Sequence, residues 1–187
     1  MSEFKVVLAS GAEHLKHGFE KLGFQVFSSA SNFDGKRFFP NTDLYVRIAE
    51  VEELADQRVL VIQSCTGSSP ASREFYTTSD RVQELLLLLD LLKNPVDVET
   101  LGHKQYRTKS LTPPSQIEVV LTLQPFALQD KAFSTGEAVS SRCTMRSIAE
   151  RCEKLWLVEP IANRNISWVE ELVERHKYEI ISITQEI

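Results

Sequence analysis

Val59-Leu60-Val61-Ile62 and Val119-Val120-Leu121 are the uninterrupted apolar runs that decide the fold class of this chain. In an antiparallel sheet with one solvent-exposed face, each strand alternates apolar and polar residues. Buried parallel strands are apolar throughout, because helices cover both faces of their sheet. Segments with helical periodicity separate the two runs. The runs therefore predict an α/β protein with a mostly parallel central sheet and helices on both faces.

Other short runs rich in β-branched residues extend this sheet. The predicted strands cover residues 4–9, 25–28, 43–48, 59–64, 117–123, 155–159 and 179–184. Apolar residues spaced three and four apart predict helices over about 11–22, 80–93, 139–152 and 167–176, and Gly23 stands where a C-terminal cap is expected. Alternation of the two element types supports the same fold class.

The helix expected over residues 80–93 carries leucines on nearly all sides. One stripe, enough to cover the sheet, consists of Val82, Leu85, Leu86, Leu89 and Leu92. Leu87, Leu88 and Leu91 lie off this stripe and need another apolar partner. If a second chain covers them, the protein is at least a dimer with this helix in the contact; the alternative is cover from within the same chain.

Residues 94–116 contain Pro95, Pro113 and Pro114 and have no clear period, so they are predicted to be a long loop inserted in a single domain of residues 1–187. The net charge of -5 disfavours nucleic acid as a partner. The first ten residues lack the apolar region of a secretory signal, and the longest apolar run is too short to span a membrane, so a cytoplasmic location is expected.

Several common site motifs are missing from the sequence. Cys65, Cys143 and Cys152 have no spacing that suits a metal ion, and they are expected to be free thiols. The glycine-containing stretch 64–69 lacks the second glycine and the lysine of a phosphate-binding loop. No GxSxG sequence marks an acyl-transfer nucleophile.

The stretch that carries information about function is Arg37-Phe38-Phe39-Pro40-Asn41-Thr42-Asp43-Leu44-Tyr45-Val46-Arg47-Ile48. It resembles the segment R-F-P-D-G-E-L-Y-V-R-I of the ribose-phosphate pyrophosphokinases, also called phosphoribosyl pyrophosphate synthetases. Three further stretches follow in the order found in that family. They are 59–64, ending in Gln63-Ser64, the leucine-rich helix of 79–90, and Ala127-Leu128-Gln129-Asp130-Lys131-Ala132-Phe133 with Gly136-Glu137-Ala138-Val139-Ser140 after it. The last is similar to the archaeal-type wording A-R-Q-D-K-x-F-x-x-G-E-A-V-S.

The resemblance covers the N-terminal half of the synthetases, whose fold is of the phosphoribosyltransferase type. It implies an adenine pocket that uses Phe39, Asn41 and Asp43 across a subunit contact, with Gln129 and Asp130 also on the nucleotide. ATP or ADP with Mg²⁺ is the ligand that the family implies, although the residues themselves fix no cofactor. The family also implies assembly, either as a homo-oligomer or as a hetero-oligomer with a full-length synthetase.

Departures from the family pattern weaken the predicted chemistry. Leu128 stands where the family has arginine, Ile161 stands where it has the histidine of D-L-H, and Asn41-Thr42-Asp43 replaces D-G-E. The sequence holds neither an Asp-Asp pair nor the Thr-Gly-Gly of the ribose-phosphate loop. We therefore assign no catalytic residue and predict a non-catalytic homologue, a regulatory or structural subunit. The alternatives are one half of a split, active ribose-phosphate pyrophosphokinase and an adenine-nucleotide sensor.

Overall fold

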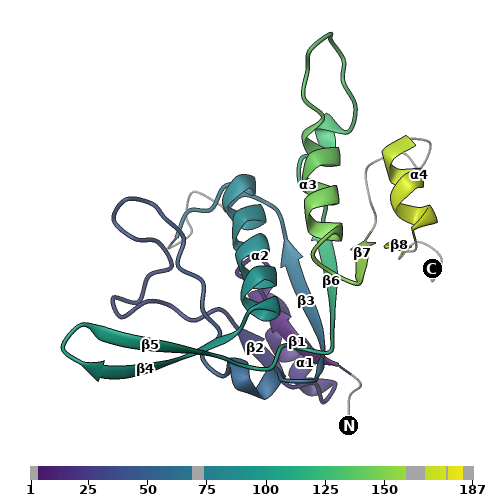
Figure 1. Cartoon of the computed structure of the whole chain (residues 1–187). Helices are drawn as coiled ribbons and strands as arrows, with labels where there is room; N and C mark the ends of the chain where they lie inside the picture. The colour runs from purple at the N-terminus through teal and green to yellow at the C-terminus, as the bar shows by residue number, and fades with distance from the viewer. Residues whose placement is uncertain (1–3, 69–73, 159–166, 176, 183–187) are drawn as a thin grey trace.

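A six-stranded parallel sheet forms the centre of the protein in the computed structural model, which describes residues 4–68, 74–158, 167–175 and 177–182 (Figure 1). The strand order is β2-β1-β3-β6-β7-β8, and every neighbouring pair is parallel. The strands are β1 (Lys5–Leu8), β2 (Val26–Ser28), β3 (Arg58–Ser64), β6 (Gln116–Leu123), β7 (Lys154–Val158) and β8 (Tyr178–Ile181). The two apolar runs lie in the adjacent strands β3 and β6, and the predicted α/β class is confirmed.

Helices cover both faces of the sheet, as predicted. On one face, a 3-10 turn, η1 (Glu13–Leu15), and α1 (Lys16–Lys21) pack Leu15 and Phe19 over Val6, Leu8 and Ile62. On the other face lie α2 (Thr78–Lys93), α3 (Ser140–Ala149) and α4 (Ser167–Glu174), whose apolar side chains share one core with the opposite side chains of β1, β3, β6 and β7. Gly23 has a φ of 83°, which fits its predicted role after α1.

Helix α2 begins with a capping box in which Thr77 and Asp80 satisfy each other's backbone N–H groups. Its buried stripe is formed by Arg81, Val82, Glu84, Leu85, Leu88, Leu89 and Leu92. The expectation that Leu88 faces a partner chain is therefore wrong, because this side chain is fully buried in its own core. Leu91 is half-buried against the same core, so intrachain packing covers most of the second leucine row.

The segment predicted as a loop over 94–116 contains a two-stranded antiparallel ribbon, β4 (Val96–Gly102) and β5 (Gln105–Ser110). The ribbon extends away from the sheet beside the lower end of α2 (Figure 1). The two strands pair only with each other, and both faces of the ribbon are exposed to solvent. The prolines of the segment favoured a loop in the prediction, but they lie at its two ends, outside the strands.

The strand predicted over 43–48 is also wrong. Leu44 makes an isolated bridge to Phe38, and the Arg47 carbonyl accepts from the Ala30 N–H just after β2, but the segment joins no strand ladder of the sheet. Two 3-10 turns complete the described elements, η2 (Val51–Leu54) and η3 (Ala127–Gln129). Among the helices that the structure describes, none is both long and apolar enough to cross a bilayer.

Candidate functional site

The direction of strand addition reverses between β1 and β3. The chain goes from β1 outward to β2 on one side and from β3 through β6 to β8 on the other. Open α/β sheets bind ligands at the carboxyl ends of the strands at such a reversal. Ser10 and Gly11 follow β1 at this place, and Gln63 lies near the end of β3.

A buried polar cluster occupies the reversal point. Glu84 of α2 accepts a hydrogen bond from the Ser10 backbone N–H at 3.1 Å and another from the Ser10 hydroxyl. The side-chain amide of Gln63 donates to Glu84 at 2.9 Å and to the Arg81 carbonyl at 3.0 Å. Its oxygen accepts from the Gly11 backbone N–H at 3.0 Å. The cluster thus fastens the first loop of the chain to the end of β3 and to α2.

Arg81 connects this cluster to the segment before α2. Its guanidinium donates to the Ser10 hydroxyl and to Ser68 Oγ, the latter at 3.3 Å, and lies 3.9 Å from the centre of the Tyr76 ring. The same guanidinium is 3.9 Å from the Glu84 carboxylate. Both partners of this ion pair are buried, so each charge depends on the other and on the surrounding hydrogen bonds.

The electrostatics of the cluster are balanced between cations and carboxylates. Burial and the charge of Glu84 raise the pKa of Tyr76, which keeps its hydroxyl protonated. Burial alone lowers the pKa of Arg37, but the hydrogen bond and charge of Glu13 outweigh it and the net shift is upward. Burial raises the pKa of Cys65 to about 12, so this thiol stays protonated at neutral pH and is a poor nucleophile. This arrangement fits a rigid support better than an anion-binding site.

The predicted adenine-pocket residues lie on a tight turn outside this cluster. The Phe39 N–H donates to the Asp43 carbonyl at 2.8 Å, and Thr42 takes a φ of 70° at the turn. The Asn41 amide donates to the Asp43 carboxylate at 2.5 Å. Phe39 is 40% exposed and meets the Tyr45 ring edge-on, with centroids 5.8 Å apart. The turn therefore presents an aromatic surface with two polar side chains beside it.

Gln129 and Asp130 lie on a second loop, after β6. Gln129 Nε2 donates to Glu137 Oε1 at 3.0 Å, and the other oxygen of Glu137 accepts from the backbone N–H groups of Phe133 and Ser134. The Asp130 carbonyl accepts from the Trp168 indole N–H at 2.9 Å. Leu128, the residue in place of the family's arginine, is 88% exposed. Ile161, in place of the family's histidine, lies outside the described residues.

The structure does not bring the two predicted groups together within one chain. Among the described residues, no hydrogen bond or ring contact joins the turn of 39–45 to the loop of 127–137, and in Figure 1 the two project in different directions. No group of three or more potential metal ligands occurs in the described part of the chain. An adenine pocket completed by a second chain is what the resemblance predicts.

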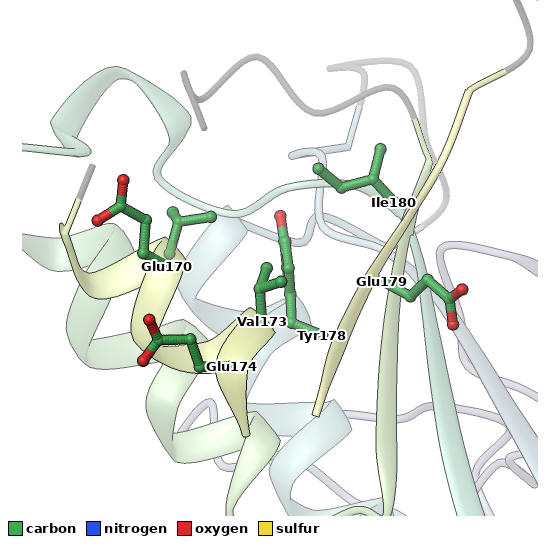
Figure 2. A pocket seen from close by; sticks show the side chains of 7 residues that line it. Glu170, Val173, Glu174, Tyr178, Glu179 and Ile180 are labelled. Carbon is green, nitrogen blue, oxygen red and sulfur yellow. The ribbon is translucent and has the colours of Figure 1, made fainter. Parts of the chain in front are cut away.

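A separate hollow of about 550 Å³ lies between α4 and β8 (Figure 2). Val169, Val173, Tyr178 and Ile180 supply its apolar lining, and Glu170, Glu174 and Glu179 are its charged residues. Glu179 is paired with Lys154, but Glu170 and Glu174 have no cation in the lining and would repel phosphate groups. This hollow is therefore a poor candidate for a nucleotide site.

The buried cluster contains residues that sequence reasoning passed over. The leucine-rich pattern indicates only a helix around Arg81 and Glu84, and no motif includes Tyr76. No local pattern marks Glu84, because the predicted stripe of Val82, Leu85, Leu86, Leu89 and Leu92 leaves it out, and a carboxylate is expected inside only where partners are present. The Gln63-Ser64 ending of β3, which is part of the resemblance, is the feature of this cluster that the sequence does mark.

Comparisons with known proteins agree with this fold and with the resemblance in sequence. No protein-family model matches the chain. The chain is 31% identical over 110 residues to a ribose-phosphate pyrophosphokinase of Methanosarcina mazei, which covers 59% of this chain and 26% of that protein. The fold matches a crystal structure of phosphoribosylpyrophosphate synthetase from Mycobacterium smegmatis with a TM-score of 0.68 at 16% identity, covering 98% of this chain and 50% of that one. The chain thus spans half or less of the length of these proteins; it is similar in sequence to the first and has the fold of half of the second.

Proposed function

We propose that the chain is a non-catalytic relative of ribose-phosphate pyrophosphokinase and serves as a regulatory or structural subunit in phosphoribosyl pyrophosphate metabolism. The observation that carries this proposal is the composition of the loop of 127–137. Leu128 is its most exposed large apolar side chain, and Gln129 and Glu137 use their polar groups on each other. A cytoplasmic location, where ATP and Mg²⁺ are available, belongs to the same proposal.

Transfer of a pyrophosphoryl group needs several cations around the phosphates, because charge on the phosphate oxygens must be stabilised in the transition state. Lys131 is the single cation in the sequence of this loop, and its ammonium lies 5.5 Å from the centre of the Phe133 ring. Loss of one such contact typically costs about 3–4 kcal/mol of transition-state stabilisation. With Leu128 in place of a guanidinium, we expect no useful turnover.

The test is a coupled assay for phosphoribosyl pyrophosphate with the purified chain, Mg²⁺, ATP and ribose 5-phosphate. We expect no product above a control without protein. The variant Leu128→Arg should not restore activity, because a ribose-phosphate loop is still missing from these 187 residues. Turnover by the unmodified chain would refute the non-catalytic assignment.

The retained stretches Gln129-Asp130-Lys131 and Gly136-Glu137-Ala138 favour a second candidate, one half of a split and active synthetase. The same assay, repeated with a full-length or complementary partner protein, separates the two. An increase in product that depends on this chain and disappears in an Asp130→Ala variant would support the split enzyme. An increase that persists in that variant would support a regulatory role.

The exposed Phe39–Tyr45 ring pair favours a third candidate, an adenine-nucleotide sensor. Isothermal titration with ATP and with ADP measures this directly. Phe39→Ala should abolish any heat of binding, whereas Phe33→Ala, at a 97% exposed phenylalanine on a neighbouring turn, should leave it unchanged. Equal losses in both variants would show that the ring pair does not bind the base.

A further inference from the structure

The ribbon formed by β4 and β5 has two chemically different faces. Residues directly opposite in an antiparallel pair point to the same face, and the faces alternate along each strand. The pairs Val96–Ser110, Val98–Thr108 and Thr100–Tyr106 therefore form a face without charged groups. We call it the apolar face, because Val96, Val98 and Tyr106 are its large side chains and small hydroxyl side chains fill the places between them. The pairs Asp97–Lys109 and Glu99–Arg107 form a charged face, where opposite charges stand across from each other.

Exposure to solvent is favourable for the charged face and unfavourable for the large side chains of the apolar face. Arg107 and Glu99 approach to 3.9 Å, and both are well exposed. On the apolar face Val96, Val98 and Tyr106 are 49%, 53% and 65% exposed. An isolated two-stranded ribbon is marginally stable in water, and packing against another element on its apolar face stabilises it. The apolar face is therefore a candidate contact surface.

A groove of about 540 Å³ lies at the base of the ribbon. Val96 and Val98 form one wall, and Val51, Leu91 and Leu111 contribute further apolar surface. Arg47, Glu52 and Asp97 are the charged residues that line it, so its net charge is negative.

The far end of the ribbon carries the opposite charge. The tip of the ribbon, 101–106, contains Lys104 and no carboxylate, whereas Arg107 lies on the charged face opposite Glu99. The tip also contains the exposed ring of Tyr106, which lies on the apolar face. One ribbon thus has a basic end with an aromatic side chain and a base with an acidic, apolar groove.

We propose that the ribbon covers the ribbon of a second copy of this chain, apolar face against apolar face and in opposite directions. In a dimer with a two-fold axis, residue i of the first copy contacts residue j of the second, and residue j of the first contacts residue i of the second. The same surface of each copy therefore forms the whole interface. Tyr106 of each copy then lies over the valines and the groove at the base of the other, and Lys104, in the turn at the tip of the ribbon, approaches the partner's acidic rim. This proposal rests on the self-association that the proposed subunit role includes, and it names the surface responsible.

Sedimentation velocity over a wide range of protein concentration tests the surface. The double variant Val98→Gln with Tyr106→Gln should turn a dimer into a folded monomer, with circular dichroism as the check on folding. Glu99→Gln with Arg107→Gln is the matched control, because it changes the same two strands on the charged face only. The control should remain a dimer.

Cross-linking gives a second measurement that does not depend on the stability of the first variant. Copies with Val98→Cys are mixed with copies with Tyr106→Cys, both in a Cys143→Ser background that removes the exposed native thiol. Under mild oxidation the mixture should give more disulfide-linked dimer than either protein alone.

A monomeric wild-type chain would overturn both this surface and the self-association, while leaving the non-catalytic assignment to the activity assay. A dimer that survives the apolar-face variant, or that gives no preferential cross-link in the mixture, would overturn the ribbon surface alone. Assembly would then occur elsewhere on the protein, and the proposed subunit role would stand.

Discussion

The Glu84 carboxylate accepts a hydrogen bond from the Ser10 backbone N–H at 3.1 Å, across 74 positions of sequence. Glu84→Ala would leave Arg81 as a buried charge without its carboxylate and would remove an acceptor from Gln63. Breaking a buried ion pair in this way costs about 3–5 kcal/mol of unfolding free energy. Urea unfolding should show this loss, whereas Gln83→Ala, at an exposed neighbour on the same helix, should change stability little. Equal effects of the two variants would mean that the cluster does not stabilise the fold.

Gly11 and Gly18 provide a matched pair of glycine substitutions. A Cβ atom at Gly11 would lie 2.2 Å from the Ser64 carbonyl oxygen and 2.6 Å from Gln63 Oε1, whereas one at Gly18 meets nothing within 4 Å. Gly11→Ala should therefore lower the unfolding free energy by separating the first loop from β3. Gly18 lies inside α1, where alanine is better than glycine by about 1 kcal/mol, so Gly18→Ala should raise it. Thermal unfolding of both variants provides the measurement, and a stabilising Gly11→Ala would contradict the close approach.

Alkaline pH should destabilise the fold through its buried thiols. Burial raises the pKa of Cys65 and of Cys152 from 9.0 to about 12. The unfolded chain thus releases these protons at lower pH than the folded one, and stability is full below pH 9.0 and falls as the pH rises toward 12. Each thiol contributes a slope of about 1.4 kcal/mol per pH unit within that window. The wild type and the double variant Cys65→Ala with Cys152→Ala should differ less in unfolding free energy as the pH rises through this window. A difference that stays constant with pH would contradict the raised pKa values of the two thiols.

Two neighbouring leucines of α2 should respond differently to truncation. Leu88 is fully buried, so Leu88→Ala should cost about 2–5 kcal/mol of unfolding free energy through lost apolar contact and the cavity left behind. Leu87 is only half-buried, and Leu87→Ala should cost clearly less. Chemical unfolding of both variants measures the contrast. If Leu87→Ala were the more damaging change, the packing of this helix would be different from that described.

The fold class was predictable because the apolar runs of β3 and β6 must be covered on both sides, and only helices between parallel strands do so within one chain. The register of α2 was less predictable. Seven leucines in eight positions from 85 to 92 satisfy any choice of buried stripe, so the sequence placed Leu88 on the wrong side. The exposed Gln83 and Asp90 and the buried Glu84 fix the observed register, and only the packing shows that Glu84 is inside.

The two wrong strand and loop assignments have a common physical origin. Residues 43–48 have the composition of a strand, but a strand also needs a neighbour with free backbone groups, and only Phe38 supplies a bridge. Residues 96–110 do find a neighbour, each strand serving the other. The identity of the predicted nucleotide residues came from resemblance, and their distribution over two separate loops depends on tertiary contacts that no local pattern encodes.

The ribbon begins and ends at one place, since the Leu111 N–H donates to the Pro95 carbonyl at 2.8 Å. The path of the chain from α2 into β6 would be nearly the same if the polypeptide passed directly from one of these residues to the other. Such a segment can be gained or lost in a single genetic event without disturbing the sheet, because the entropy of closing a loop changes little with its length. Ancestors and descendants of this protein could thus differ in whether they possess the ribbon while sharing every strand of the core.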